Sequence, residues 1–221
     1  VDVDGAVNFA ADVTYADGAD IITASAGTSN FRAGVNAGNS IASGGNYNVA
    51  IGDEAGTAIT TGDNNTAVGY SALLSNTTAG NNVAVGVNAL KLNTTGTLNT
   101  AIGKDSLAQN TEADNNTAVG LDTLYANTTG ASNTAVGSRA LDANTTADNN
   151  TAVGTSALTA NTTGTENTAV GTDALSATIT GSYNTAVGRS AALLTTGDHN
   201  TAVGRIALRT NSSGANNTAL G

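Results

Sequence analysis

Asn65-Thr66-Ala67-Val68-Gly69 is the stretch that decides the fold, because the chain repeats it with small variations along most of its length. Near-copies end at Gly52, Gly69, Gly86, Gly103, Gly120, Gly137, Gly154, Gly171, Gly188, Gly204 and Gly221. Successive glycines are 17 residues apart in nine intervals, and the interval from Gly188 to Gly204 is shorter by a single position. Self-similarity at a fixed short period is typical of a solenoid, in which each repeat stacks on the next. Ten regular units therefore fill residues 52–221.

The composition suits a thin, stacked core rather than a globular one. The 221 residues include 27 glycines, only 3% aromatic and 11% charged residues, and no Pro, Cys, Met or Trp. These are too few large side chains for a globular core, whereas stacked Val, Leu, Ala and Thr can fill a solenoid. We therefore expect an all-β parallel β-solenoid (a β-roll or β-helix) built from 17-residue coils. At the ~4.8 Å spacing of paired strands, ten units make a rod of roughly 48 Å.

Residues 1–30 differ from the repeats. Val1-Asp2-Val3-Asp4 alternates apolar and polar residues, and Ala16-Asp17-Gly18 is a turn signal, which together predict short strands joined by turns. We interpret residues 1–30 as an N-terminal cap or neck and residues 31–221 as the solenoid domain. Its first unit, residues 30–52, is irregular. Because the chain contains no Met, we expect it to be part of a longer protein.

The motif predicts which strand faces are buried. Thr66 and Val68 share one face, and because other copies place Val49 and Ile51 there, we expect this face to point inward. The Ala between them is present in every copy: Ala50, Ala67, Ala84, Ala101, Ala118, Ala135, Ala152, Ala169, Ala186, Ala202 and Ala219. We expect this row of methyl groups to pack against other copies of the chain in a homotrimer. The alternative is that the Ala row packs within one chain.

The remainder of the unit predicts a second strand and two turns. The motif glycine indicates a sharp turn with positive φ. Pairs such as Ala72-Leu73 predict a second strand with Leu in the core, and Asn-Thr-Thr-Gly predicts a turn. The Asn that begins each motif, such as Asn65, is expected to form a ladder of amides hydrogen-bonded between coils. Ala191-Ala192-Leu193, inside the shorter interval, predicts a local bulge or shortened loop.

No residue pattern indicates an enzyme, a cofactor or a metal site. The single histidine, His199, has no recognisable triad partner and is expected to be a turn residue at a coil edge. Asp53 and Glu54 are adjacent and would diverge on an extended chain. Asp63-Asn64-Asn65, Asp114-Asn115-Asn116 and Asp148-Asn149-Asn150 place oxygen ligands on turns, but one carboxylate per turn falls short of the six to eight oxygens that Ca²⁺ prefers.

Charge and hydropathy exclude two classes of partner. The net charge is -10, and the seven Lys and Arg residues are scattered, which argues against a nucleic-acid surface. No long, uninterrupted apolar run is present, so we expect no membrane insertion.

Two further patterns allow other interpretations. Asn76-Thr77-Thr78 and its equivalents match the N-glycosylation pattern, although the repeat explains them as turns and an Asn ladder. The same Thr pairs suggest an ice-binding face, which Glu112 and Ile179 would interrupt.

The motif also resembles known families. Asn82-Val83-Ala84-Val85-Gly86 and Asn48-Val49-Ala50-Ile51-Gly52 resemble the head repeat of trimeric autotransporter adhesins, which implies a left-handed parallel β-roll in a trimer. The fuller pattern of residues 150–164 is similar to repeats of bacteriophage tail-fibre proteins, and the opening residues 1–9 look like a tail-fibre linker strand.

The tail-fibre resemblance implies a structural role. The chain would be the homotrimeric shaft of a fibre on an extracellular virion, supporting attachment to a host surface. Its partners would be itself, other virion tail components and a host cell-surface glycan or protein. The alternative is the head domain of an adhesin on the bacterial cell surface that binds host or matrix surfaces. Neither resemblance assigns ligand-binding residues.

Overall fold

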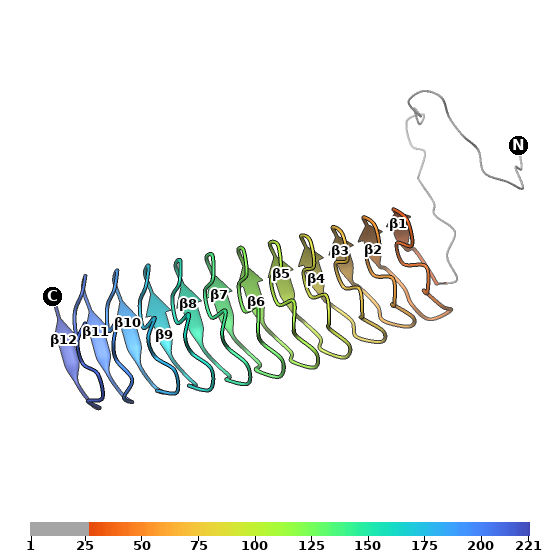
Figure 1. Ribbon diagram of the computed structural model, residues 1–221. Coiled ribbons are helices and arrows are strands. Elements are labelled where there is room, and N and C mark those ends of the chain that lie inside the picture. Colours follow the sequence, from red (N-terminus) through yellow and green to blue (C-terminus); the bar gives the residue numbers. More distant parts are fainter. Residues whose placement is uncertain (1–26) are drawn as a thin grey trace, which may run out of the picture.

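The computed structural model describes residues 27–221, which form a rod of stacked coils (Figure 1). The regular elements of this part of the chain are short strands, one in each coil. They are β1 (Phe31–Ala33), β2 (Val49–Ile51), β3 (Thr66–Val68), β4 (Val83–Val85), β5 (Thr100–Ile102), β6 (Thr117–Val119), β7 (Thr134–Val136), β8 (Thr151–Val153), β9 (Thr168–Val170), β10 (Thr185–Val187), β11 (Thr201–Val203) and β12 (Thr218–Leu220). The predicted neck falls outside the described residues, except for residues 27–30.

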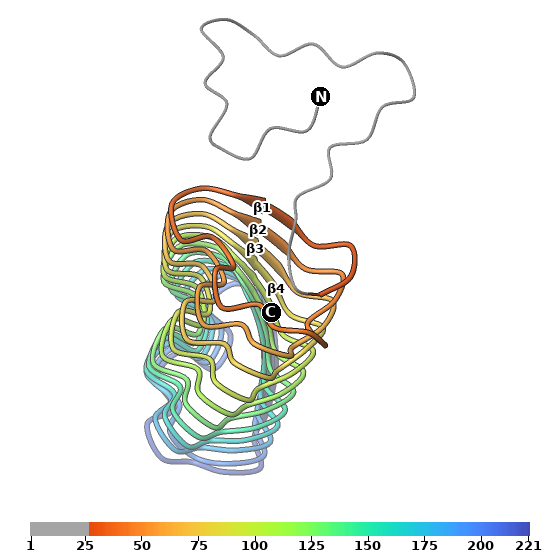
Figure 2. The same ribbon diagram turned by 90° about the vertical axis from the view of Figure 1, so that its right-hand side faces the viewer.

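All twelve strands form one parallel sheet in chain order. Each motif residue lies beside its counterpart in the next coil, so that Ala135 pairs with Ala118 on one side and Ala152 on the other. The irregular first unit joins the same sheet, because Phe31 pairs with Val49. Viewed close to the rod axis, successive coils repeat one elongated outline (Figure 2). The predicted parallel β-solenoid with 17-residue coils is confirmed.

The faces of the strands are the reverse of those predicted. Ala135 is fully buried inside the coil, whereas Val136 is 38% exposed and Thr134 is also exposed. The prediction that Thr and Val point inward was wrong. The Ala row is not a surface between chains either, because it packs within one chain against the buried Leu row, in the core that includes Leu141. The coil is so thin that a Leu from the opposite side leaves room for only a methyl group.

That opposite side is made of turns rather than of the predicted second strand. We call it the second wall: the stretch from the motif glycine to the following buried polar residue, for example residues 137–144. In it the Ala140 N–H donates to the Gly137 carbonyl over 3.2 Å, and the Asn144 N–H donates to the Leu141 carbonyl over 3.1 Å. The Leu141 N–H still donates to the next coil, to the Ala157 carbonyl over 3.0 Å. The prediction that this Leu row fills the core is confirmed.

Two ladders of buried Asn side chains connect the coils. The Asn133 side chain accepts the Asn150 N–H over 2.9 Å and donates to the Ala147 carbonyl over 2.8 Å. This confirms the ladder predicted at the start of the motif. A second ladder begins each Asn-Thr-Thr turn, where the amide of Asn144 donates to the Asn127 side chain over 2.8 Å.

The motif glycines are required by close stacking. Gly137 has φ of 129°, and a Cβ atom there would lie 2.7 Å from the Gly154 carbonyl oxygen. Because L-residues rarely adopt this φ and the obstructing atom is backbone, only glycine fits. The predicted positive φ is confirmed.

The short coil loses its residue in a turn. Thr178 contacts the equivalent Thr of the next coil, since its hydroxyl donates to the Thr195 carbonyl over 2.5 Å. Gly181 then faces Gly197, where the regular repeat would place position 198. The missing residue is therefore in the turn between Thr195 and Gly197, not at Ala191-Ala192-Leu193. At that site the coil differs in another way, because Ala192 occupies the buried Leu position.

Candidate interaction surface

The outward side chains of the sheet form a continuous apolar stripe along the rod. We define the outer stripe as Ile51, Val68, Val85, Ile102, Val119, Val136, Val153, Val170, Val187, Val203 and Leu220, the third residue of each strand from β2 to β12. Most of these side chains are about two-fifths exposed, for example Ile102 at 41%. Every coil contributes one apolar group, beside the half-exposed Thr row. A contiguous apolar surface of this length is typical of a protein contact.

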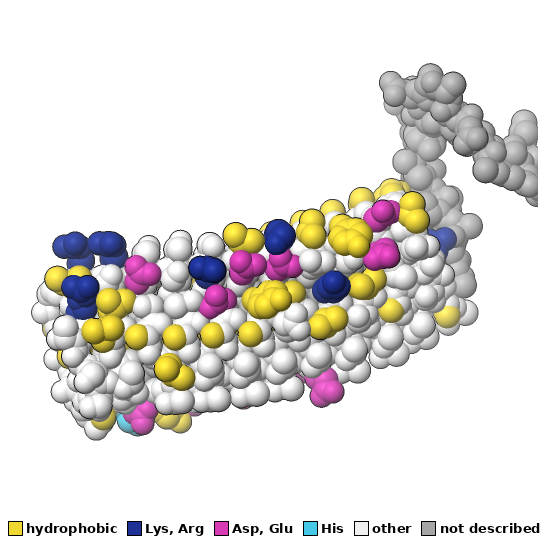
Figure 3. Space-filling model, viewed as in Figure 1, with side chains coloured by type: hydrophobic (Ala, Val, Ile, Leu, Met, Phe, Trp, Pro, Cys, Tyr) yellow, Lys and Arg dark blue, Asp and Glu magenta, His cyan; other side chains and the backbone are white. Residues whose placement is uncertain are grey.

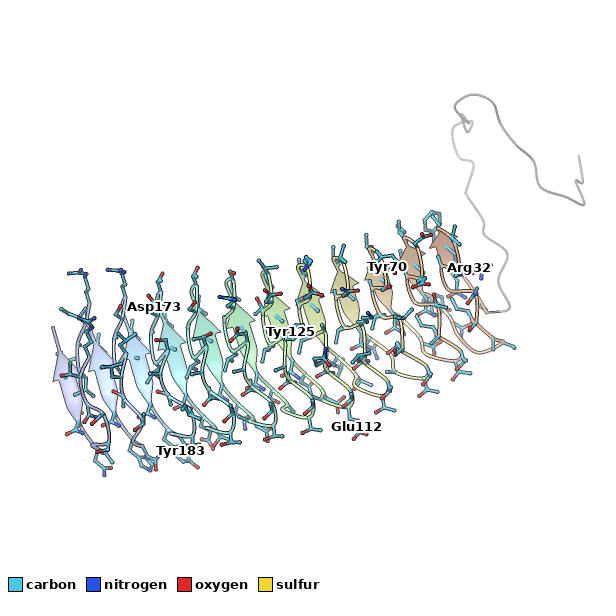
Figure 4. The ribbon with its side chains drawn as sticks, in the orientation of Figure 1. Arg32, Tyr70, Glu112, Tyr125, Asp173 and Tyr183 are labelled. Atoms are coloured by element: carbon cyan, nitrogen blue, oxygen red, sulfur yellow. The ribbon has the colours of Figure 1, made fainter. Side chains whose placement is uncertain are left out.

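Charged side chains are arranged differently. On the face seen in Figure 3, acidic and basic groups gather along the upper half of the rod, and basic groups cluster near the C-terminal end. Figure 4 places Tyr70 and Asp173 on the upper side and Glu112 and Tyr183 along the lower edge. The surface therefore varies along the rod although the core repeats.

The histidine lies where the sequence predicted. His199 is an exposed turn residue with φ of 57°, and its ring stacks on Tyr183 of the preceding coil, with ring centroids 4.8 Å apart. The adjacent carboxylates diverge as expected. Asp53 accepts the Val35 N–H of the preceding coil, whereas Glu54 accepts the hydroxyl of Ser71 in the following coil.

The turn carboxylates considered for Ca²⁺ bind backbone amides instead. Asp63 accepts the Asn46 N–H over 2.7 Å, Asp114 accepts the Thr97 N–H over 2.6 Å, and Asp148 accepts the Ala131 N–H over 2.7 Å. Each carboxylate thus joins its coil to the preceding one. Across residues 27–221, no group of three or more His, Asp or Glu side chains is placed to hold a metal ion.

The Asn of the glycosylation pattern and the first Thr of each Thr pair make hydrogen bonds within the stacked coils. Asn76 is fully buried, and its amide donates to the Ala79 carbonyl over 2.9 Å, so the folded coil leaves no access for a glycan. The first Thr of each pair is also engaged, as where the Thr128 hydroxyl donates to the Thr145 carbonyl over 3.0 Å. These first-position hydroxyls stabilise the stack, whereas the second Thr of each pair, such as Thr146, is exposed, in a row that Glu112 interrupts.

A group of large side chains midway along the second wall was not predicted. A surface depression of about 290 Å³ is lined by Asp105, Asp122, Tyr125, Arg139 and Asp142. Aligning the repeats reveals the group. Asp122 and Arg139 occupy a position that is Ser156 in the next coil. Tyr125 and Asp142 occupy a position that is Thr159 in the next coil. Reading along the chain instead of across the repeats hides this grouping.

One ion pair borders the depression, between Lys104 and Asp105. Burial alone would raise the pKa of Asp105, but hydrogen bonds from Lys104 and Asn88 outweigh burial and hold that pKa below its ordinary value. The Asn88 amide lies 2.8 Å from the Asp105 carboxylate. The hydrogen bond between Lys104 and Asp105 also raises the pKa of Lys104.

From Gly27 to Gly221 the chain has no helix long and apolar enough to cross a membrane. Comparison of the chain with protein-family models, with curated proteins and with solved structures finds no match.

Proposed function

We propose that the chain is the shaft of a bacteriophage tail fibre, a left-handed β-solenoid that assembles as a homotrimer and holds a host-binding region away from the virion. The rod geometry supports this role. Twelve strands at the ~4.8 Å spacing of a sheet give a shaft of about 53 Å, fastened by backbone and Asn hydrogen bonds between all coils. The tail-fibre-like repeat pattern adds to this support.

The outer stripe is the observation that carries the proposal. Three chains packed in parallel about a common axis would turn their stripes toward one another, and the apolar groups of each coil would meet their equivalents in the other two chains. A partner with the same coil spacing matches the stripe over its whole length. The trimer contact is therefore the Val row, and the Ala row remains in the core of each chain.

The test is the mass of the chain in solution, by light scattering after size exclusion. We expect about three times 21.4 kDa for the unaltered chain. Val136→Lys combined with Val153→Lys should give a monomer that keeps the β-sheet circular dichroism, because both side chains point outward. Thr146→Lys with Thr163→Lys is the matched control, since these exposed residues lie in the same coils and their row already contains Glu112. A monomeric unaltered chain, or trimers in both double variants, would refute this contact.

The adhesin alternative is favoured by one observation, the strand Val49–Ile51 and its flanking Asn48 and Gly52. An antibody against the 221-residue chain separates the two roles by immunogold electron microscopy. Labelling of virion tails would support the fibre shaft. Labelling of uninfected bacterial surfaces would support the adhesin head and overturn the shaft.

A further inference from the structure

The depression midway along the second wall joins three successive coils. Asp105 comes from the first coil, Asp122 and Tyr125 come from the second, and Arg139 and Asp142 come from the third. Figure 4 shows Tyr125 near the middle of the rod, and Figure 3 shows acidic, basic and hydrophobic side chains together in that region. The depression is a property of one chain, because all five side chains belong to it.

The coil itself does not need these large side chains. At the equivalent positions in neighbouring coils the chain uses Ser156, Thr159 and Ser176, and the backbone is the same. The positive φ at Arg139, 57°, matches that of Ser156, 55°. The large groups therefore add surface chemistry to a scaffold that folds with small ones.

Several of these groups are free to bind. Asp105 is engaged by Lys104 and Asn88, and one oxygen of Asp142 accepts the Thr159 hydroxyl over 2.7 Å. In contrast, the side chains of Asp122 and Arg139 make no hydrogen bond or ion pair with residues 27–221. Tyr125 is 39% exposed, and its hydroxyl has only a 3.5 Å contact with Gln109. An acceptor, a donor and an aromatic ring thus line one concave surface.

This combination selects the chemistry of the ligand. Three carboxylates repel an anion. Lys104 pairs with Asp105 and Arg139 offsets one further carboxylate, so little net charge is left to hold a cation, and the described residues include no cluster of carboxylates placed for a metal ion. A neutral ring with several hydroxyl groups can use the carboxylates and the guanidinium together. Its hydroxyls can donate to Asp122 and accept from Arg139, hydrogen bonds that are strengthened by the charged partner. Its apolar C–H face can lie on the exposed ring of Tyr125.

We propose that the depression is a binding site for a neutral saccharide unit, with Asp122, Tyr125 and Arg139 as the contacting residues. The site does not depend on the trimer or on the fibre shaft, since one chain supplies all of it. A shaft with such a site would contact a surface polysaccharide along its side as well as at its tip.

The test is binding of the fluorescently labelled 221-residue chain to an array of neutral, sialylated and free-amino oligosaccharides. We expect binding to a subset of the neutral glycans. Each variant replaces one contact with the residue that the repeat uses elsewhere: Asp122→Ser, Arg139→Ser and Tyr125→Thr. Each should weaken binding by about tenfold, the effect of losing one charge-assisted hydrogen bond or the ring contact.

Asp173→Ser is the matched control, because Asp173 occupies the position of Asp122 three coils further on, outside the depression. Its binding should equal that of the unaltered chain. Three results would overturn the proposal: no neutral glycan bound, preferential binding of sialylated or free-amino glycans, or equal loss in Asp173→Ser and Asp122→Ser. None of these readouts involves the mass of the assembly, so the failure of this site and the failure of the trimer are distinguishable.

Discussion

Each buried Asn of the first ladder serves three coils at once. Asn133 accepts from the backbone of Asn150, donates to the Ala147 carbonyl, and its own N–H donates to the side chain of Asn116 over 2.9 Å. Burial of these amides is stabilising only because each polar group has a partner. Removing the Asn133 side chain therefore leaves the Asn150 N–H without its acceptor and takes one of two side-chain donors from the Ala147 carbonyl, which keeps the Asn144 amide.

Asn133→Ala should lower the free energy of unfolding by about 2–4 kcal/mol, since the Asn150 N–H and the Ala147 carbonyl would each lose a buried hydrogen bond. Urea unfolding followed by circular dichroism measures the change. Asn149→Ser is the control, because this exposed position is Ser132 in another coil and the change should stay within about 0.5 kcal/mol. Equal effects in the two variants would contradict the role of the ladder.

A charged side chain in the Ala row would have to be buried inside the coil. Ala135→Lys should prevent formation of the central coils, because an ammonium group would be placed in a fully buried position without a partner. The expected readout is loss of the circular dichroism signal, or protease cleavage close to residue 135. If Ala135→Lys folds but its assembly has a smaller mass than that of the unaltered chain, the Ala row would instead be a contact with another chain.

The carboxylate of Asp105 gives a prediction for pH. Because its pKa in the folded chain lies below its ordinary value, ionised Asp105 stabilises the fold at neutral pH, and this contribution is lost as the pH falls through the folded-state pKa. The unaltered chain should therefore exceed Asp105→Asn in unfolding midpoint at pH 7, and the difference should shrink below about pH 4. A difference in unfolding midpoint that grows as the pH falls would contradict the stabilising role of ionised Asp105. Asp173→Asn, in the same row, controls for the substitution itself.

At the scale of the element, the coil combines one short strand with left-handed residues on the second wall. Leu141 has φ of 53°, a conformation that bulky residues rarely adopt. The buried Leu row accepts it in coil after coil because the turn aims the side chain into the core. Burial and inter-coil hydrogen bonds thus outweigh the backbone cost.

The coil that begins at Gly188 departs from this row, since it has Ala192 where its neighbours have Leu175 and Leu208. Ala192 has φ of 49°, close to the values at the Leu positions, so the backbone accommodates Leu there. Ala192→Leu should raise the free energy of unfolding by about 0.5–2 kcal/mol by filling the core. Thermal unfolding measures this. Destabilisation would show that the shortened coil is too narrow for the side chain.

For the whole molecule, stability should be close to a sum over coils and the contacts between neighbours. Deletion of residues 138–154 removes one unit and joins Gly137 to Thr155, which keeps every row aligned. We expect cooperative unfolding. The slope of the unfolding free energy against urea concentration should be lower by roughly a tenth, because unfolding exposes less surface. Deletion of residues 138–145 is the control. It breaks the alignment, and it should abolish the cooperative transition.

Much of this architecture could be predicted from the period alone. The repeat gives the sheet order, the register, the Asn ladder and the Leu core, because each depends only on which residues recur. The strand faces were assigned wrongly because Val49 at a Thr position suggested burial. The motif contained the correction, since Asn65 and Ala67 alternate with Thr66 and share a face, and a hydrogen-bonded amide ladder belongs inside. The depression around Tyr125 was not predictable from the period, since it consists of departures from it.

The hydrogen bonds between coils have a mechanical consequence. They run along the rod, so a pull on the chain at one end loads one coil while the others remain intact. Each detached coil would release roughly 50 Å of extended chain. Such a rod resists bending as a unit, but under tension it lengthens in small, equal steps as single coils detach.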